Sequence, residues 1–132
     1  MRTGGQEENL VVLGETIIGA ALKVHSHLGP GLLESVYEAC LIHELCQQGL
    51  AVEAQRVLPI CYNGLVLDSA LRLDILVENL VVLEIKAAAQ LLPIHKAQLI
   101  SYLRLGNFPL GYLLNFNEVH MRQGIKRVAR EI

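Results

Sequence analysis

The sequence predicts an α/β domain in which helices flank a central mixed β-sheet. Apolar residues recur at helical spacing in the first third of the chain, and β-branched apolar runs fill residues 52–86. A further helical segment and a last apolar strand follow these runs. The order helix, helix, strands, helix, strand is typical of layered α/β domains.

The chain of 132 residues is long enough for one domain with a substantial core. We expect residues 1–8 to be a flexible N-terminus and residues 9–132 to form a single domain. Apolar residues make up 52% of the chain and aromatic residues only 5%, so the core must be aliphatic. Because this apolar fraction is high for a small domain, part of it is expected to cover a subunit interface. A homo-oligomer, most simply a two-fold dimer, is therefore predicted.

The net charge of −2 excludes a global field that attracts nucleic acid, so any such binding requires a local basic patch. The alternative is that the protein does not bind nucleic acid tightly by itself.

The chain has three cysteines, Cys40, Cys46 and Cys61. Their number is odd and they form no CxxC pair, so we expect neither a disulfide framework nor a structural zinc site. The apolar stretch Leu10–Leu22 contains Glu15 and is too short to span a bilayer. We expect a cytoplasmic protein without membrane association.

The first helix is expected from Asn9 to about His27. Its main apolar stripe is Leu10, Leu13, Ile17, Ala20, Val24 and Leu28, and a second stripe is Val11, Ile18 and Leu22. The second stripe exceeds what one core-facing surface needs, so either a partner helix covers it or the fold itself does. The second helix is expected from about Leu33 to Gln48, with Gly49 as its C-terminal cap.

Strands are expected at about Val52–Tyr62, Leu65–Asp68, Leu71–Val77 and Leu80–Lys86. Asn63 and Gly64 favour a tight hairpin turn, and Pro59 predicts an edge strand or a bulge. A third helix is expected to begin after Pro93, run to about Leu105 and end at Gly106. A last strand is expected over Phe108–Asn115, followed by a polar, basic tail beyond Asn117.

The most informative spacing joins Asp74, Glu84 and Lys86 across a predicted hairpin. Side chains alternate along a strand, so Glu84 and Lys86 project from one face. A two-residue turn at Glu78–Asn79 would pair Asp74 with Leu83, whereas a three-residue loop pairs it with Glu84. We favour the second register, because Asn79 tolerates the left-handed conformation that such loops require.

Two converging carboxylates beside a lysine are a plausible site for a hard divalent cation. An acid and an ammonium group on an apolar strand are costly to bury unless they pair or bind a ligand. The alternative is an exposed, ion-paired hairpin in which Asp74, Glu84 and Lys86 are simply solvated.

Several segments in the right order resemble the GxxExxY family. They are Gly31-Leu32-Leu33-Glu34-Ser35-Val36-Tyr37, Leu71-Arg72-Leu73-Asp74, Leu83-Glu84-Ile85-Lys86-Ala87, the segment His95 to Leu103, and the closing Asn115-Phe116 and Gly124-Ile125-Lys126-Arg127. The resemblance covers about Leu13 to Val128. It implies a PD-(D/E)XK restriction-endonuclease-like core of order α-β-β-β-α-β with an extra N-terminal helix.

The resemblance also implies a metal site. Asp74, Glu84 and the Ile85 carbonyl would hold Mg²⁺ or Mn²⁺, and Lys86 would stabilise charge in the transition state. Glu34 matches the helical acidic residue that superfamily members place at the metal. Its alternative role is a helix-terminal carboxylate stabilised by the dipole.

Gln98 is expected by resemblance to line the same cleft as a catalytic residue. Tyr102 lies four residues further on the same helix face, where it would hold a phosphate or position Gln98. These two residues could equally form a buried hydrogen-bonded pair. Lys96, Lys126 and Arg127 are expected to contact substrate phosphates.

The sequence thus predicts a metal-dependent nuclease acting on DNA in preference to RNA. The alternative is a weakly active or inactive nuclease-like fold that serves assembly or regulation. The intact Asp74, Glu84 and Lys86 set favours the enzyme, whereas the acidic net charge and the apolar excess favour assembly.

Overall fold

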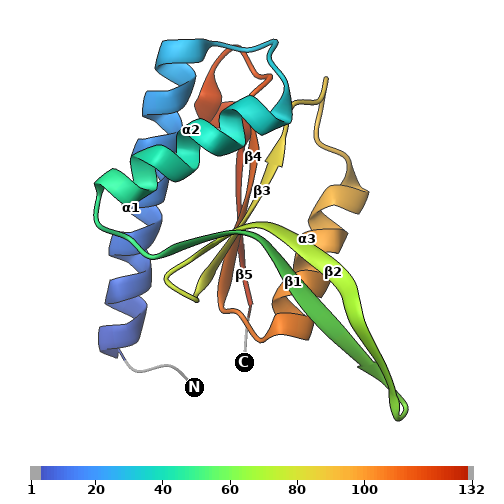
Figure 1. The fold of residues 1–132 in the computed structure, drawn as a ribbon. Coiled ribbons are helices and arrows are strands. Elements are labelled where there is room, and N and C mark those ends of the chain that lie inside the picture. The colour runs from blue at the N-terminus through green and yellow to red at the C-terminus, as the bar shows by residue number, and fades with distance from the viewer. Residues whose placement is uncertain (1–3, 131–132) are drawn as a thin grey trace.

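A five-stranded sheet of order β1-β2-β3-β4-β5 organises the chain (Figure 1). The computed structural model describes residues 4–130. The elements in chain order are α1 (Gly4–Leu28), α2 (Glu34–Gln47), β1 (Val52–Tyr62), β2 (Leu65–Val77), β3 (Val81–Lys86), α3 (Pro93–Gly106), β4 (Leu110–Asn115), the 3₁₀ helix η1 (Met121–Gly124) and β5 (Ile125–Ala129). Only β3 and β4 pair in parallel, and α3 connects them. The predicted mixed sheet flanked by helices is confirmed.

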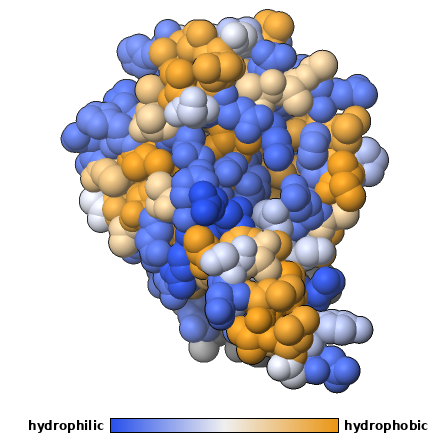
Figure 2. All heavy atoms as spheres, turned by 45° about the vertical axis from the view of Figure 1, so that its right-hand side comes forward, coloured by the Kyte–Doolittle hydropathy of each residue, from blue (hydrophilic) through white to orange (hydrophobic). Residues whose placement is uncertain are grey.

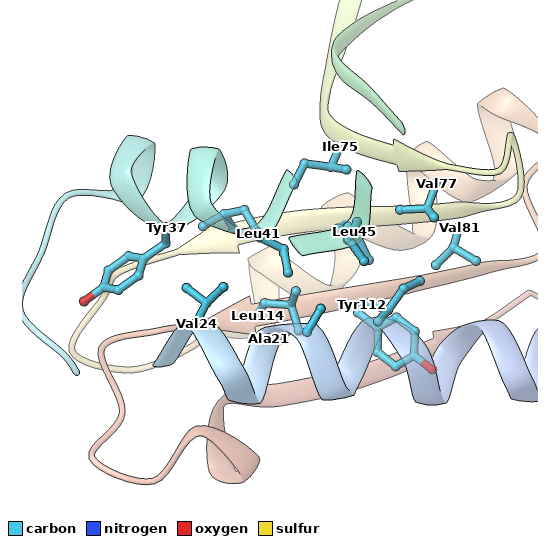
Figure 3. Close-up of a cluster of buried hydrophobic side chains, with 14 of the residues drawn as sticks. Ala21, Val24, Tyr37, Leu41, Leu45, Ile75, Val77, Val81, Tyr112 and Leu114 are labelled. Atoms are coloured by element: carbon cyan, nitrogen blue, oxygen red, sulfur yellow. The ribbon is translucent and has the colours of Figure 1, made fainter. Parts of the chain in front are cut away.

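Two apolar layers hold the helices on opposite faces of the sheet (Figure 1). On one face, α1 and α2 pack against alternate residues of β3, namely Val81, Leu83 and Ile85. Figure 3 shows this layer, in which Leu41 and Leu45 from α2 lie over side chains of β2 and β3. The other layer joins α3 to the sheet, and its β3 member is Val82.

Side chains alternate between the two faces of the sheet along β3, so the position of each charged residue determines which helix it faces. Glu84 and Lys86 share the face of Val82, which packs against Leu99 and Leu103 of α3. Both charged residues consequently lie on the α3 side of the sheet, away from the α1 and α2 layer.

The β1–β2 hairpin confirms two local predictions. Tyr62 pairs with Leu65 across a two-residue turn, with Asn63 at φ 47° and Gly64 at φ 87°. The register of β1 shifts around Pro59, and β1 is an edge strand of the sheet. The two strand segments expected between 65 and 77 are one continuous strand, β2.

Three boundaries differ from the sequence prediction. The first helix begins at Gly4, so residues 4–8 of the expected flexible segment are helical, and residues 1–3 of that segment lie outside the described residues. The last predicted strand begins at Leu110. The polar tail forms η1 and the edge strand β5, in which Val128 is buried against α3 and the neighbouring side chains are solvent-facing. Within residues 4–130, no helix is long and apolar enough to cross a bilayer.

Candidate metal and active site

The site forms where β2 and β3 separate. Their pairing extends from Val77–Val81 to Ile75–Leu83 and then ends, which confirms the predicted three-residue loop. Asp74 and Glu84 are the next residues on the two strands. The Asp74 Oδ2 atom accepts a hydrogen bond from the Ile85 backbone N–H at 2.8 Å, so Asp74 reaches across the gap between the strands.

The loop that sets this register contains two residues in the left-handed region. Asn79 has φ 55°, as its short polar side chain allows, and Glu78 has φ 53°. Glu78 is held there by Ala51, because its N–H donates to the Ala51 carbonyl at 2.8 Å and its Oε2 accepts from the Ala51 N–H at 2.5 Å. The chain entering β1 thus stabilises the hairpin that brings Asp74 to Glu84.

Glu84 is the most perturbed acid in the described part of the chain. Its side chain is buried and only 6% exposed. Burial, the charge of Asp74 and a hydrogen bond between the two carboxyl groups together raise the pKa of its carboxyl to about 9, and the charge of Lys86 opposes this rise. Its Oε1 atom is buried without a hydrogen-bond partner. A buried acceptor without a donor is costly, so this atom fits a cation or a proton.

Helix α3 adds Gln98 and Tyr102 to the same neighbourhood. Burial raises the pKa of the Tyr102 hydroxyl, and the negative charges of Glu84 and Asp74 raise it further. A hydrogen bond with Gln98 acts in the opposite direction. Tyr102 therefore stays a hydrogen-bond donor facing the acidic pair, and Gln98 orients it.

Helix α2 contributes an acid that the sequence analysis missed. Glu38 lies one turn after Glu34, and its pKa is raised by burial and by the charges of Asp74 and Glu34. Gln55, at φ 53° in β1, donates to both carboxylate oxygens of Glu38 at 3.0 and 3.1 Å. The four-residue spacing of the two acids was the available signal.

Glu34 itself lies in the exposed first turn of α2. No cluster of three His, Cys, Asp or Glu side chains within residues 4–130 is close enough to hold one ion. The expected gathering of Glu34 with Asp74 and Glu84 around one metal is therefore absent from this part of the chain. The α2 helix packs on the opposite face of the sheet from Glu84.

The segment that follows Lys86 is held by a buried asparagine on the neighbouring strand. Asn115 pairs with Lys86 in the β3–β4 register and is 0% exposed. Its side chain donates to the Ala88 carbonyl at 3.0 Å and accepts from the Ala88 N–H at 3.1 Å. The Lys86 carbonyl accepts from the Phe116 N–H at 2.9 Å. Asn115 thus fixes the chain that leaves the site, a role that its position in the sequence did not reveal.

Tyr37 of the GxxExxY-like segment is structural. Its ring is buried and stacks on Phe116 with centroids 4.7 Å apart. Its hydroxyl donates to the Gly29 carbonyl at 2.6 Å and accepts from the Leu32 N–H at 3.0 Å. The residue therefore closes the loop between α1 and α2, which positions the start of α2.

The predicted substrate-binding cations do not lie beside the acidic pair. Lys96, Lys126 and Arg127 line grooves between α3 and β5, on the side of α3 away from Tyr102. The structure therefore brings together Asp74, Glu84, Lys86, Gln98 and Tyr102, and it separates the basic residues from them.

The donor set fits a divalent cation. Asp74 supplies carboxylate oxygens, and Glu84 supplies the Oε1 atom that has no partner. The Ile85 N–H points toward β2, and the N–H and C=O of one strand residue point the same way, so its carbonyl also faces the gap. Two carboxylates and one carbonyl are sufficient for Mg²⁺, which keeps several waters.

A family model of the PD-(D/E)XK nuclease superfamily matches residues 12–128. The chain belongs to this superfamily. No curated protein and no solved structure gave a significant match. Membership of the PD-(D/E)XK superfamily indicates a nuclease-type phosphodiesterase, and nucleases of this superfamily generally use divalent metals.

Proposed function

We propose that this PD-(D/E)XK protein is a Mg²⁺- or Mn²⁺-dependent nuclease that hydrolyses phosphodiester bonds in DNA. The observation that carries the proposal is the buried Glu84 carboxyl, whose Oε1 has no partner beside Asp74 at the end of the β2–β3 pairing. A carboxyl in this position is explained by a cation, because a cation satisfies the buried oxygen and favours its ionised form.

The protein's own groups have separate roles in this proposal. Asp74, Glu84 and the Ile85 carbonyl would hold the cation, which would neutralise phosphate charge and lower the pKa of water at the site. The Lys86 ammonium donates to the phosphate oxygens, whose charge increases in the transition state. The Tyr102 hydroxyl, oriented by Gln98, donates to a second phosphate oxygen.

Purified protein incubated with labelled single-stranded, duplex and branched DNA, and with RNA, tests this proposal in Mg²⁺ and in Mn²⁺. We expect metal-dependent cleavage of DNA that falls about 10²–10³-fold in Lys86→Ala, the usual cost of removing one transition-state donor. Lys23→Ala is the matched control, because Lys23 lies on α1 and pairs with Glu44 at 3.1 Å. Equal activity of wild type and Lys86→Ala on every substrate would mean that the activity is contamination.

A second function, assembly through the β1–β2 hairpin, is favoured by the apolar tip of this hairpin. Tyr62 is 70% exposed, and Leu65, Val66 and Leu67 are also exposed. Figure 2 shows apolar surface at the lower end of the molecule, over this hairpin. An exposed apolar patch commonly marks an interaction surface. Along α1, by contrast, Ile18 and Leu22 of the second stripe pack partly against the core, which leaves little of that stripe for a partner.

A further inference from the structure

A groove lies between α3 and β5, outside the candidate active site. It has a volume of about 580 Å³ and is lined by Lys96, Ile100, Leu103, Arg104 and residues 127–130. A neighbouring groove of about 360 Å³ shares Lys96, Arg127 and Val128 with it and adds Lys126. We call the two together the basic groove.

The basic groove concentrates positive charge in a protein whose net charge is −2. Five of the 11 lysines and arginines line it, and no acidic side chain belongs to either lining. Lys96, Arg104, Lys126 and Arg127 form no ion pair with any residue of the described range 4–130. Unpaired cations held close together repel one another, so this arrangement fits an anionic ligand.

Helix α3 separates the basic groove from the acidic pair. Lys96, Ile100 and Arg104 follow one another at four-residue spacing and line the groove. Gln98 and Tyr102 occupy another face of the helix, beside Glu84 and Asp74. A helix with its side chains is about 10 Å across, so a chain that contacts both sides must cross about that distance.

We propose that the basic groove binds the sugar–phosphate backbone of the nucleic acid beyond the cleaved bond, so that the substrate strand crosses α3. This inference rests on the proposed nuclease function and defines the substrate as a polynucleotide. Arg104 presents a guanidinium group that matches phosphate geometry. Lys126 lies on the α3 face of β5, two residues from the buried Val128, and adds an ammonium group, and Ile100 provides apolar surface for sugars. At about 3.4 Å per nucleotide along the axis, crossing α3 requires roughly three to four nucleotides beyond the cleaved bond.

Fluorescence anisotropy in EDTA tests the groove without cleavage, with a labelled 20-nucleotide single strand titrated at several salt concentrations. We expect Arg104→Ala/Lys126→Ala to bind about 25-fold more weakly at 0.1 M salt, which corresponds to about fivefold per lost phosphate contact. The slope of log K against log salt should fall by about 1.4, and the two proteins should converge near 1 M salt. Arg122→Ala, an exposed arginine of η1, is the matched control and should bind as wild type.

Two further measurements distinguish a failure of the groove proposal from a failure of the nuclease proposal and from misfolding of the variant. Arg104→Lys/Lys126→Arg keeps the charge and should restore the slope, which a merely misfolded variant would not. Hydrolysis of the small phosphodiester bis(p-nitrophenyl) phosphate in Mn²⁺ should be equal in wild type and in the double alanine variant, because this substrate cannot cross α3. If the double alanine variant binds the single strand more weakly but wild type hydrolyses no phosphodiester, the groove is a nucleic-acid binding site and the proposed nuclease function is wrong. The proposed role of the groove would be wrong if the alanine variant showed the wild-type slope of log K against log salt, or if wild type bound no nucleic acid.

Discussion

The protonation of Glu84 makes the stability of the metal-free protein depend on pH. Its folded pKa, raised by burial and by Asp74, is about 9, against an ordinary value of 4.5. The folded protein therefore binds more protons than the unfolded chain between these values. The contribution of Glu84 is fully present below pH 4.5 and is lost as the pH rises toward 9. The slope is at most about 1.4 kcal/mol per pH unit, or about 3 kcal/mol between pH 4.5 and 7.

Urea unfolding in EDTA at pH 5, 6, 7 and 8 measures this effect, and Glu84→Gln is the informative variant. The amide keeps the shape of the carboxyl but does not titrate, so its free energy of unfolding should decline less steeply with pH than that of wild type. Glu15→Gln, at an exposed position of α1, should follow wild type. Equal slopes for wild type and Glu84→Gln would refute the claim that this carboxyl is buried and neutral.

Further predictions concern the supports of the site and the apolar hairpin. Asn115→Ala removes the acceptor of the Ala88 and Asn117 N–H groups and one donor to the Ala88 carbonyl, so urea unfolding should show a loss of about 3 kcal/mol. Tyr37→Phe keeps the ring stack but loses both hydroxyl hydrogen bonds, so the same assay should show a loss of about 1–2 kcal/mol. A change below about 0.5 kcal/mol in either variant would contradict these roles. Light scattering at micromolar concentration should show a dimer that Leu65→Lys/Val66→Lys dissociates, and a monomeric wild type would reject the apolar hairpin as an interface.

The core of the site could be predicted from the sequence because it depends on local rules. Strand alternation puts Glu84 and Lys86 on one face, and the preference of Asn79 for the left-handed region favours the register that pairs Val77 with Val81. The conformation of Glu78 could not be predicted in this way, since it depends on contacts with Ala51, far away in the sequence.

The missing parts of the prediction depend on contacts between distant segments. Glu38 is bonded by Gln55, which has a positive φ in β1, and no short-range pattern reveals that pairing. The strand β5 lacks an alternating apolar pattern, because it is an edge strand with one buried position at Val128. Because β5 could not be predicted from the sequence, the basic residues of the tail could be recognised as cations but could not be placed in a groove beside α3.

Isothermal titration of Mn²⁺ into the metal-free protein tests the central claim, that Asp74 and Glu84 together bind a divalent cation. Wild type and Glu15→Gln should bind Mn²⁺ with the same heat, and binding should tighten as the pH rises, because the cation competes with the Glu84 proton. Asp74→Asn and Glu84→Gln should each weaken binding strongly, and the double variant should lose it. A double variant that binds Mn²⁺ like the wild type would contradict the account.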